Sequence, residues 1–261
     1  MDELGQPGVG LEAYARRARE VQEAVLTEER EHLQRAARLL ADSLVLEDER
    51  DRVIHVFGAG HSHLLAEEMF WRAGGLVPIH PILDPNLTPL GGPRSGPLER
   101  LEGYAGILLS GEELRPGEAM VVFSNSGINA APVEMALLAR ELGLRVVAVT
   151  SRAHADQMPS RHSSGRKLHE LADVTIDTHV PPGDASVDLE DLAGERAAGY
   201  RAGPLSTVAG ALVANALVAE VAYLRMAAGA DPVVLRSQNL PGSEETNEEL
   251  IARYRKRIRY Y

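Results

Sequence analysis

A short apolar run followed by a polar turn and a helical pattern recurs along this chain, and it constrains the fold more than any other feature. In the clearest copy, Met120 to Phe123 form the run and Ser124-Asn125-Ser126-Gly127-Ile128-Asn129 form the turn. Apolar residues then recur at helical spacing up to Gly143, with Pro132 where a first helical turn tolerates proline. An unbroken apolar run suits a strand buried on both faces. The unit is therefore predicted to be buried strand, hydroxyl-rich turn and helix.

Two further copies of this unit make a sheet the expected framework. The run 53–57 leads into Gly58-Ala59-Gly60-His61-Ser62-His63 and a helical pattern, and the run 145–149 ends in Thr150-Ser151. Shorter strands are predicted at 76–83 and 174–177. Strands that alternate with helices in this way predict an α/β fold with a doubly wound parallel sheet. In such sheets, ligands bind at the carboxyl ends of the strands.

The chemistry of the 124–129 turn favours an anion. The first amides of a helix lack internal partners and carry the positive end of its dipole. Ser124 and Ser126 add hydroxyl donors, Asn129 adds an amide, and Gly127 allows close approach of the backbone. Because the turn has no lysine, neutral donors would hold the anion, and a phosphate monoester on a small metabolite is an anion that could use them. The alternative is an ordinary polar turn before a capped helix.

Composition narrows the functional classes. The chain has 261 residues and a net charge of −11, which argues against a general nucleic-acid binder. It has no cysteine, which excludes disulfides, thiol nucleophiles and cysteine-ligated metals. No signal peptide is visible at the N-terminus, and the one long apolar stretch, 208–228, contains Asn215, Glu220 and Arg225. We therefore expect a cytoplasmic protein that does not enter a membrane.

The helical patterns at the two ends suggest three parts. From Leu11 to about Leu46 the apolar stripe predicts one uninterrupted helix of roughly 50 Å, part of which would pack on another subunit. Ser206 caps the helix predicted at 208–228. The expected organisation is a helical arm over 1–50, a ligand-binding domain over 51–235 and a tail helix over 236–261. The basic end of the tail is expected to pack on the acidic surface of the protein or on a partner subunit.

The sequence motifs give little support to a cofactor site or a metal site. The first glycine-rich turn resembles a dinucleotide fingerprint, but His63 stands in place of its third glycine. Asp84 would be the ribose-binding acid of that hypothesis, and Asp84-Pro85-Asn86 fits a turn equally well. His154, His162 and His169 lack tight ligand spacing, so a polar loop is favoured over a metal site. Neither a cofactor nor a metal is predicted.

The turns at Gly58–His63 and 124–127, read as GAGHSH and SNSG, resemble those of the SIS (sugar isomerase) domain over roughly residues 11–235. This is the phosphosugar-binding fold of phosphoheptose isomerase and N-acetylmuramic acid 6-phosphate etherase, and FGAGHSH is similar to a bacterial group of single-SIS-domain proteins. The resemblance implies a five-stranded parallel sheet in a flavodoxin-like three-layer sandwich, with long N- and C-terminal helices at the interface of a homodimer or homotetramer.

The resemblance also implies site residues. Phosphate or sugar contacts are expected from one set in the turns: Gly60, Ser62, Ser124, Asn125, Ser126, Gly127, Asn129 and Ser151. The family places a catalytic glutamate about three helical turns after the first serine, where this chain has Arg72. The base therefore stays open among Glu68, His63 and His61, with Glu67 and Glu220 as further candidates.

Three functions follow from the resemblance. The first is cofactor-free isomerisation of a phosphorylated sugar or amino sugar, with proton transfer between C1 and C2. The second is a phosphosugar lyase or etherase, which abstracts a similar proton but expels a leaving group. The third is a non-catalytic phosphosugar sensor. Regulators of this kind usually carry a helix-turn-helix domain, which residues 1–50 do not suggest.

Overall fold

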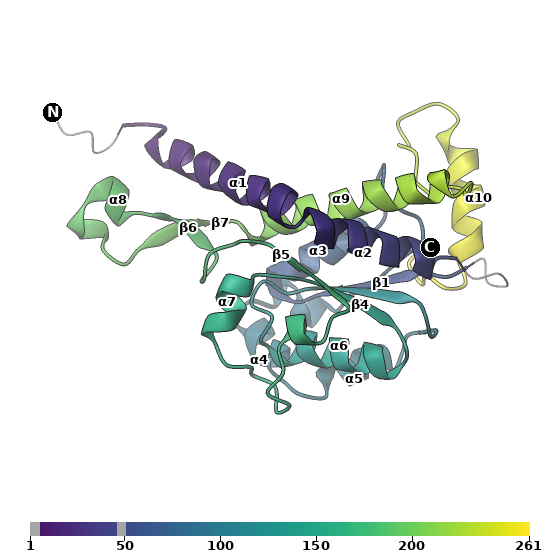
Figure 1. The fold of residues 1–261 in the computed structure, drawn as a ribbon, viewed down its shortest axis with the longest axis horizontal. Helices are drawn as coiled ribbons and strands as arrows, with labels where there is room; N and C mark the ends of the chain where they lie inside the picture. Colours follow the sequence, from purple (N-terminus) through teal and green to yellow (C-terminus); the bar gives the residue numbers. More distant parts are fainter. Residues whose placement is uncertain (1–5, 46–50) are drawn as a thin grey trace.

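The computed structural model describes residues 6–45 and 51–261, and Figure 1 shows a sheet between two layers of helices. Five parallel strands lie in the order β2-β1-β3-β4-β5. Their bounds are Ile54–Gly58 for β1, Ile79–Ile82 for β2, Ala119–Phe123 for β3, Arg145–Thr150 for β4 and Val174–Asp177 for β5. The doubly wound five-stranded sheet expected from the sequence is confirmed.

Helices bury both faces of the sheet, which explains why its strands are apolar without alternation. Ile54 and Val56 point into a core shared with α2 (Arg30–Ser43), α3 (His63–Met69) and α9 (Ser206–Ala227). Phe57, Met120 and Val122 point into the opposite core, under α5 (Tyr104–Leu109) and α6 (Ala130–Glu141). Shorter helices are α4 (Ser95–Glu99), α7 (Arg152–Gln157) and α8 (Glu190–Ala193).

The prediction of one long N-terminal helix is wrong. The chain forms α1 (Val9–Glu28) and α2, which are separated at Glu29 (φ −96°, ψ 9°), and the predicted end at Leu46 lies outside the described residues. The break places the Glu29 carboxylate against other elements, because Oε2 accepts the amide of Asp177 at 3.1 Å and Oε1 lies 3.4 Å from His179 Nε2. Glu29 also pairs locally with His32 at 2.8 Å, but these two partners come from the end of β5 and the residues after it, so local sequence gives no sign of them.

An antiparallel hairpin was also missed by the sequence prediction. β6 (Ala185–Asp188) pairs with β7 (Arg201–Pro204), and α8 lies between them in an acidic stretch of the chain. The hairpin and α1 lead away from the sheet together (Figure 1), and Tyr14 on α1 donates to the carbonyl oxygen of Pro204. α1 and the hairpin therefore form one projecting arm.

The long apolar helix α9 is confirmed by the structure, but the expected cap at Ser206 is wrong, because the helix begins at Ser206 and the hydroxyl of this residue donates to Asp184 at 2.7 Å. By length and composition α9 could cross a membrane. This is weak evidence for a membrane span, because a core helix of a folded protein passes the same test. α9 packs on α2 and α3, and the side chain of Leu65 fills the space beside Gly210, where a Cβ would lie 2.3 Å from Leu65 Cδ1. α9 therefore forms part of the core.

The C-terminal segment returns to the start of the sheet. α10 (Ser243–Tyr254) is the tail helix, and Arg257 beyond it bonds Glu118 while Arg259 pairs with Glu112 at 3.3 Å. The basic tail thus packs on acidic groups of its own chain, one of the two expected arrangements. The division at residues 50 and 235 remains a prediction, although α2 and α10 share one core with the sheet.

Candidate functional site

Two polar turns meet where the strand order reverses. The chain passes from β1 outward to β2 and then returns to β3 on the other side of β1, so the switch point lies between β1 and β3. Gly58 at the end of β1 is in register with Phe123 at the end of β3. The turns that follow these two residues therefore begin side by side at the carboxyl edge of the sheet.

The turn after β1 needs glycine at its first position. A Cβ on Gly58 would lie 2.1 Å from the carbonyl oxygen of Ser62, so no other residue fits there. Gly60 has φ +59°, a left-handed conformation that favours glycine. Residues Gly60–Ser62 then form a 3₁₀ turn that leads into α3. The glycines are thus explained by the path of the backbone, without a bound dinucleotide.

The turn after β3 is held by contacts with β4. Gly127 has φ +64°, and a Cβ there would lie 2.6 Å from Thr150 Oγ1. The hydroxyl of Ser124 accepts the amide of Gly127 at 3.2 Å, and the carbonyl oxygen of Asn125 accepts the amide of Ser151 at 3.0 Å. These contacts fix the turn before any ligand is present.

Two serine hydroxyls in these turns are left available. Within the described part of the chain, neither Ser62 Oγ nor Ser126 Oγ has a hydrogen-bond partner, and both side chains are half-buried. Ser62, Ser124 and Asn125 line one small cavity of about 10 Å³ together with Thr178 and Ser206. A cavity of this size holds about one water molecule. This cavity is therefore too small for a sugar phosphate, and Ser126 does not line it.

Ser151 and Asn129 hold the structure around the turns. The buried hydroxyl of Ser151 donates to the carbonyl oxygen of Val180 at 2.7 Å and accepts the amide of His154 at 3.1 Å, so it caps α7. Asn129 precedes α6, and its Oδ1 accepts a hydrogen bond from Arg161 at 2.7 Å. Of the eight expected contact residues, Ser62, Ser124 and Asn125 surround the small cavity, whereas Ser151 lies behind the turn.

Both ring nitrogens of His63 are occupied. Nε2 accepts the backbone amide of Asp84 at 3.3 Å, so the ring proton lies on Nδ1, which is 2.9 Å from Glu67 Oε1. The buried ring therefore joins α3 to the end of β2. Asp84 itself forms the expected turn, because its Oδ1 accepts the amide of Asn86 at 2.8 Å.

The other candidate bases differ in their surroundings. Glu68 on α3 bonds Arg72, which follows that helix, and Asn215 on α9, so its carboxylate lies between α3 and α9. His61 is exposed in the first turn, next to Ser62. Of the three expected catalytic residues, His61 is therefore the one whose ring is open to a ligand at the turn.

Sequence reasoning missed a carboxyl group beside the second turn. Glu99, at the end of α4, bonds the Asn129 side chain, and burial raises the pKa of its carboxyl above the ordinary value. That hydrogen bond opposes the rise in the pKa, as do the charges of Arg100 and Arg161. A carboxyl with a raised pKa is suited to proton transfer near neutral pH. Glu99 lies in a glycine- and proline-rich stretch with no motif to mark it.

The histidines of the 152–169 segment point to separate partners. His154 Nδ1 accepts the amide of Gly183 at 3.2 Å, His162 lies near Glu102, and His169 lies 3.7 Å from Asp156. Over residues 6–45 and 51–261, no three His, Asp or Glu side chains gather as metal ligands would. His154 lies in α7 and His169 in a short 3₁₀ turn, so the segment that was expected to be a polar loop is partly helical.

Sequence comparisons identify the family. Residues 13–151, which include both turns, match the model of the SIS domain. This chain belongs to the SIS domain family. The SIS domain here is similar to UPF0309 proteins of Geobacillus kaustophilus (36% identity, 95% of each chain covered) and Halalkalibacterium halodurans (40% identity, 95% of this chain and 96% of the other).

A solved structure supports the same fold. The Vibrio vulnificus NanR protein complexed with ManNAc-6P covers 96% of this chain and 72% of its own, with a TM-score of 0.51 and 18% identity. At this identity the likeness concerns the fold alone. It extends over the SIS domain and over α9 and α10, which lie beyond the residues that the family model matches.

Proposed function

We propose that this SIS domain binds a phosphorylated sugar or amino sugar at the paired turns and isomerises it between aldose and ketose forms without a cofactor. The observation that carries this proposal is the pair of hydroxyls of Ser62 and Ser126 on adjacent turns at the switch point, to which residues 6–45 and 51–261 offer no hydrogen-bond partner. A phosphate group accepts hydrogen bonds, and the first amides of α6 favour its negative charge. A protein of the same fold is complexed with a sugar phosphate, ManNAc-6P.

The isomerisation part of the proposal rests on groups that can move a proton. His61 is open at the first turn, and Glu99 lies beside the second turn with a pKa that burial raises. A proton moved from C2 to C1 of the sugar through an enediol needs one such group within hydrogen-bond reach. Glu68 and His63 would act only after leaving their present partners.

Ligand binding is tested by thermal unfolding in the presence of sugar 6-phosphates and the parent sugars. A ligand that binds the native state raises Tm by mass action. The Ser62→Ala/Ser126→Ala variant should keep the Tm of the free protein, because these hydroxyls bond nothing in it, and should lose the response to phosphates. Ser110→Ala, an exposed serine at the end of α5, is the matched control. A response to phosphates that survives in the double variant would contradict the placement of the site.

Isomerisation is tested by following the sugar C2 proton by NMR in D₂O. An isomerase incorporates deuterium from the solvent at C2 or C1 as aldose and ketose equilibrate. A lyase or etherase would instead release a second organic product, and a sensor would bind the same ligand with no exchange. The phosphate proposal therefore survives a negative result here, whereas the isomerase proposal does not.

A further inference from the structure

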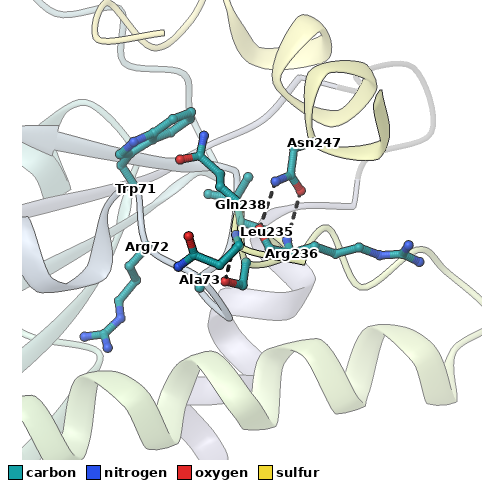
Figure 2. A pocket seen from close by; sticks show the side chains of 9 residues that line it. Trp71, Arg72, Ala73, Leu235, Arg236, Gln238 and Asn247 are labelled. Atoms are coloured by element: carbon teal, nitrogen blue, oxygen red, sulfur yellow. Dashed lines mark hydrogen bonds between the residues drawn. The ribbon is translucent and has the colours of Figure 1, made fainter. Parts of the chain in front are cut away.

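A second cavity lies at the far end of α3 from the paired turns. It has a volume of about 190 Å³, and Figure 2 shows it between the segment that follows α3 and the segment that leads to α10. Trp71, Leu235, Gln238 and Asn239 contribute to its lining. Typical pockets for drug-sized ligands have volumes of roughly 300–1,000 Å³. This one therefore suits a smaller molecule, of about the size of one sugar ring.

The walls of this cavity are fixed by backbone contacts. The carboxamide of the buried Asn247 bonds both the amide and the carbonyl oxygen of Arg236 at 2.9 Å, as the dashed lines in Figure 2 show. On the other side, the amide of Gly74 donates to the carbonyl oxygen of Leu235 at 2.8 Å. The cavity is thus formed before a ligand arrives, which lowers the entropic cost of binding.

Trp71 is held in an unfavourable backbone conformation at the edge of the cavity. Its φ is +47°, which is rare for a bulky residue, and 46% of its surface is exposed. The ring of Tyr261 packs against the indole at 5.5 Å between centroids. Strain of this kind persists where the surroundings enforce it and is concentrated at functional sites. Here it presents an aromatic surface to a preformed cavity.

The polar groups that line this cavity are neutral except for two arginines, Arg72 and Arg236. Gln238, Asn239 and Ser237 supply amide and hydroxyl groups, and among the described lining residues there is no carboxylate. Arg72 directs its guanidinium away from the cavity, toward Glu68 (Figure 2). Arg236 also extends outward in that view, at the cavity rim. The interior therefore offers an aromatic surface with carboxamides, and one arginine stands at its edge.

We infer that this cavity is a second ligand site, which binds a monosaccharide ring against Trp71. Ring C–H groups of a sugar pack on an indole face, while its hydroxyls both donate to and accept from carboxamides such as those of Gln238 and Asn239. Arg236 at the rim would add a contact to a sugar that carries a phosphate. The inference goes beyond the proposed function, because the site is built from other residues and holds whether or not the paired turns bind a ligand.

The test uses Trp71 as its own reporter, because it is the one tryptophan in the chain. We expect glucose, N-acetylglucosamine and their 6-phosphates to change the tryptophan fluorescence with a saturable concentration dependence, whereas inorganic phosphate alone should not. Gln238→Ala should raise Kd about tenfold, which corresponds to about 1.4 kcal/mol. Gln34→Ala, on the exposed surface of α2, is the matched control and should leave Kd unchanged.

Two further variants separate this site from the paired turns. Ser62→Ala/Ser126→Ala should keep the fluorescence response, and Arg236→Ala should weaken the response to the 6-phosphates only. No response to any of the sugars, or a response that is equal in Gln238→Ala, would overturn the inference. A response that is lost in the serine variant would place the sugar at the turns instead. Fluorescence that changes with protein dilution and not with sugar would identify the cavity as a contact between copies of the chain.

Discussion

Arg257 and Glu118 form an ion pair inside the protein. Nη2 of Arg257 lies 2.9 Å from Oε1 and 3.1 Å from Oε2 of Glu118, and the two side chains are 1% and 0% exposed. Glu118 also accepts the amide of Val53 at 3.0 Å and lies 2.9 Å from Nε2 of His55. The pair fastens the segment after α10 to the first residues of β1 and β3.

Removal of Arg257 should destabilise the protein strongly. Arg257→Ala leaves the carboxylate of Glu118 buried without its cation, which typically costs about 3–5 kcal/mol in the free energy of unfolding. Urea unfolding followed by circular dichroism measures the loss. Arg255→Ala is the control, since this exposed arginine pairs with Glu248 at the surface and should contribute under about 1 kcal/mol. Equal, small losses in both variants would contradict the importance of the buried pair.

The same network should make stability depend on pH in the acid range. Burial by itself raises the pKa of Glu118, but the hydrogen bond and charge of His55, the Val53 amide and the charge of Arg257 outweigh it and lower the pKa to about 2. Because this folded-state pKa lies below the unfolded value of 4.5, Glu118 stabilises the protein above pH 4.5 and ceases to do so as the pH falls toward 2. The difference corresponds to about 3 kcal/mol.

His55 should extend this dependence to higher pH. Burial lowers its pKa below the unfolded value of 6.5, so the native state binds the proton less readily than the unfolded chain does. Its stabilising contribution is therefore present above pH 6.5 and declines below it. Urea midpoints at pH 7.5, 6, 4.5 and 3 should fall steadily, and Glu118→Gln should flatten the part below pH 4.5. A midpoint that rises on acidification would refute both assignments.

Gly127→Ala should damage the second turn. Alanine at φ +64° costs about 1–2 kcal/mol, and its Cβ would in addition collide with Thr150 Oγ1 at 2.6 Å. Gly165→Ala is the matched control, because Gly165 has φ +68° with open space around it and so carries the strain alone. We expect a lower Tm for Gly127→Ala than for Gly165→Ala, and loss of the phosphosugar response in the first variant only. Equal Tm values would show that the turn adjusts to the added methyl group, so that the contact with Thr150 costs no stability.

Alanine in place of two helical glycines should change the stability of the protein in opposite directions. Gly210→Ala on α9 would place a methyl group 2.3 Å from Leu65, and overpacking of this kind typically costs about 1–3 kcal/mol. Gly106→Ala on α5 meets its nearest neighbour, Leu138, at an ordinary 3.8 Å and should gain up to about 1 kcal/mol in helix propensity. Thermal unfolding of both variants decides whether α9 and α3 pack as tightly as described.

The sheet could be predicted from the sequence because strands buried on both faces carry a strong local signal. The runs at 120–123 and 174–177 lie at β3 and β5, and each polar turn lies at the expected strand end. The break at Glu29 could not be predicted. Glutamate and arginine both favour helix, and the partners that draw the chain aside come from around residue 177.

The candidate site was predictable only where backbone geometry selects the residue. Gly60 and Gly127 have the positive φ that their turns require. Whether a serine hydroxyl is available depends on neighbours that the local sequence does not reveal, and so Ser126 and Ser151, both expected to contact the ligand, differ in their surroundings. Glu99 was missed because its position beside Asn129 arises from the packing of α4 on α6.

The contact of Arg257 with the backbone carbonyl oxygen of Asp51 spans 206 residues and has a consequence for the order of folding. Loop-closure entropy must be spent before so distant a contact forms, and such contacts slow folding. The strands and α6 can assemble from nearer neighbours, so we expect the segment after α10 to dock last. Until this segment docks, Glu118 lacks its cation. A species with a formed sheet but an undocked C-terminal segment should therefore accumulate on refolding. Arg257→Ala should speed unfolding more than it slows the early steps of folding.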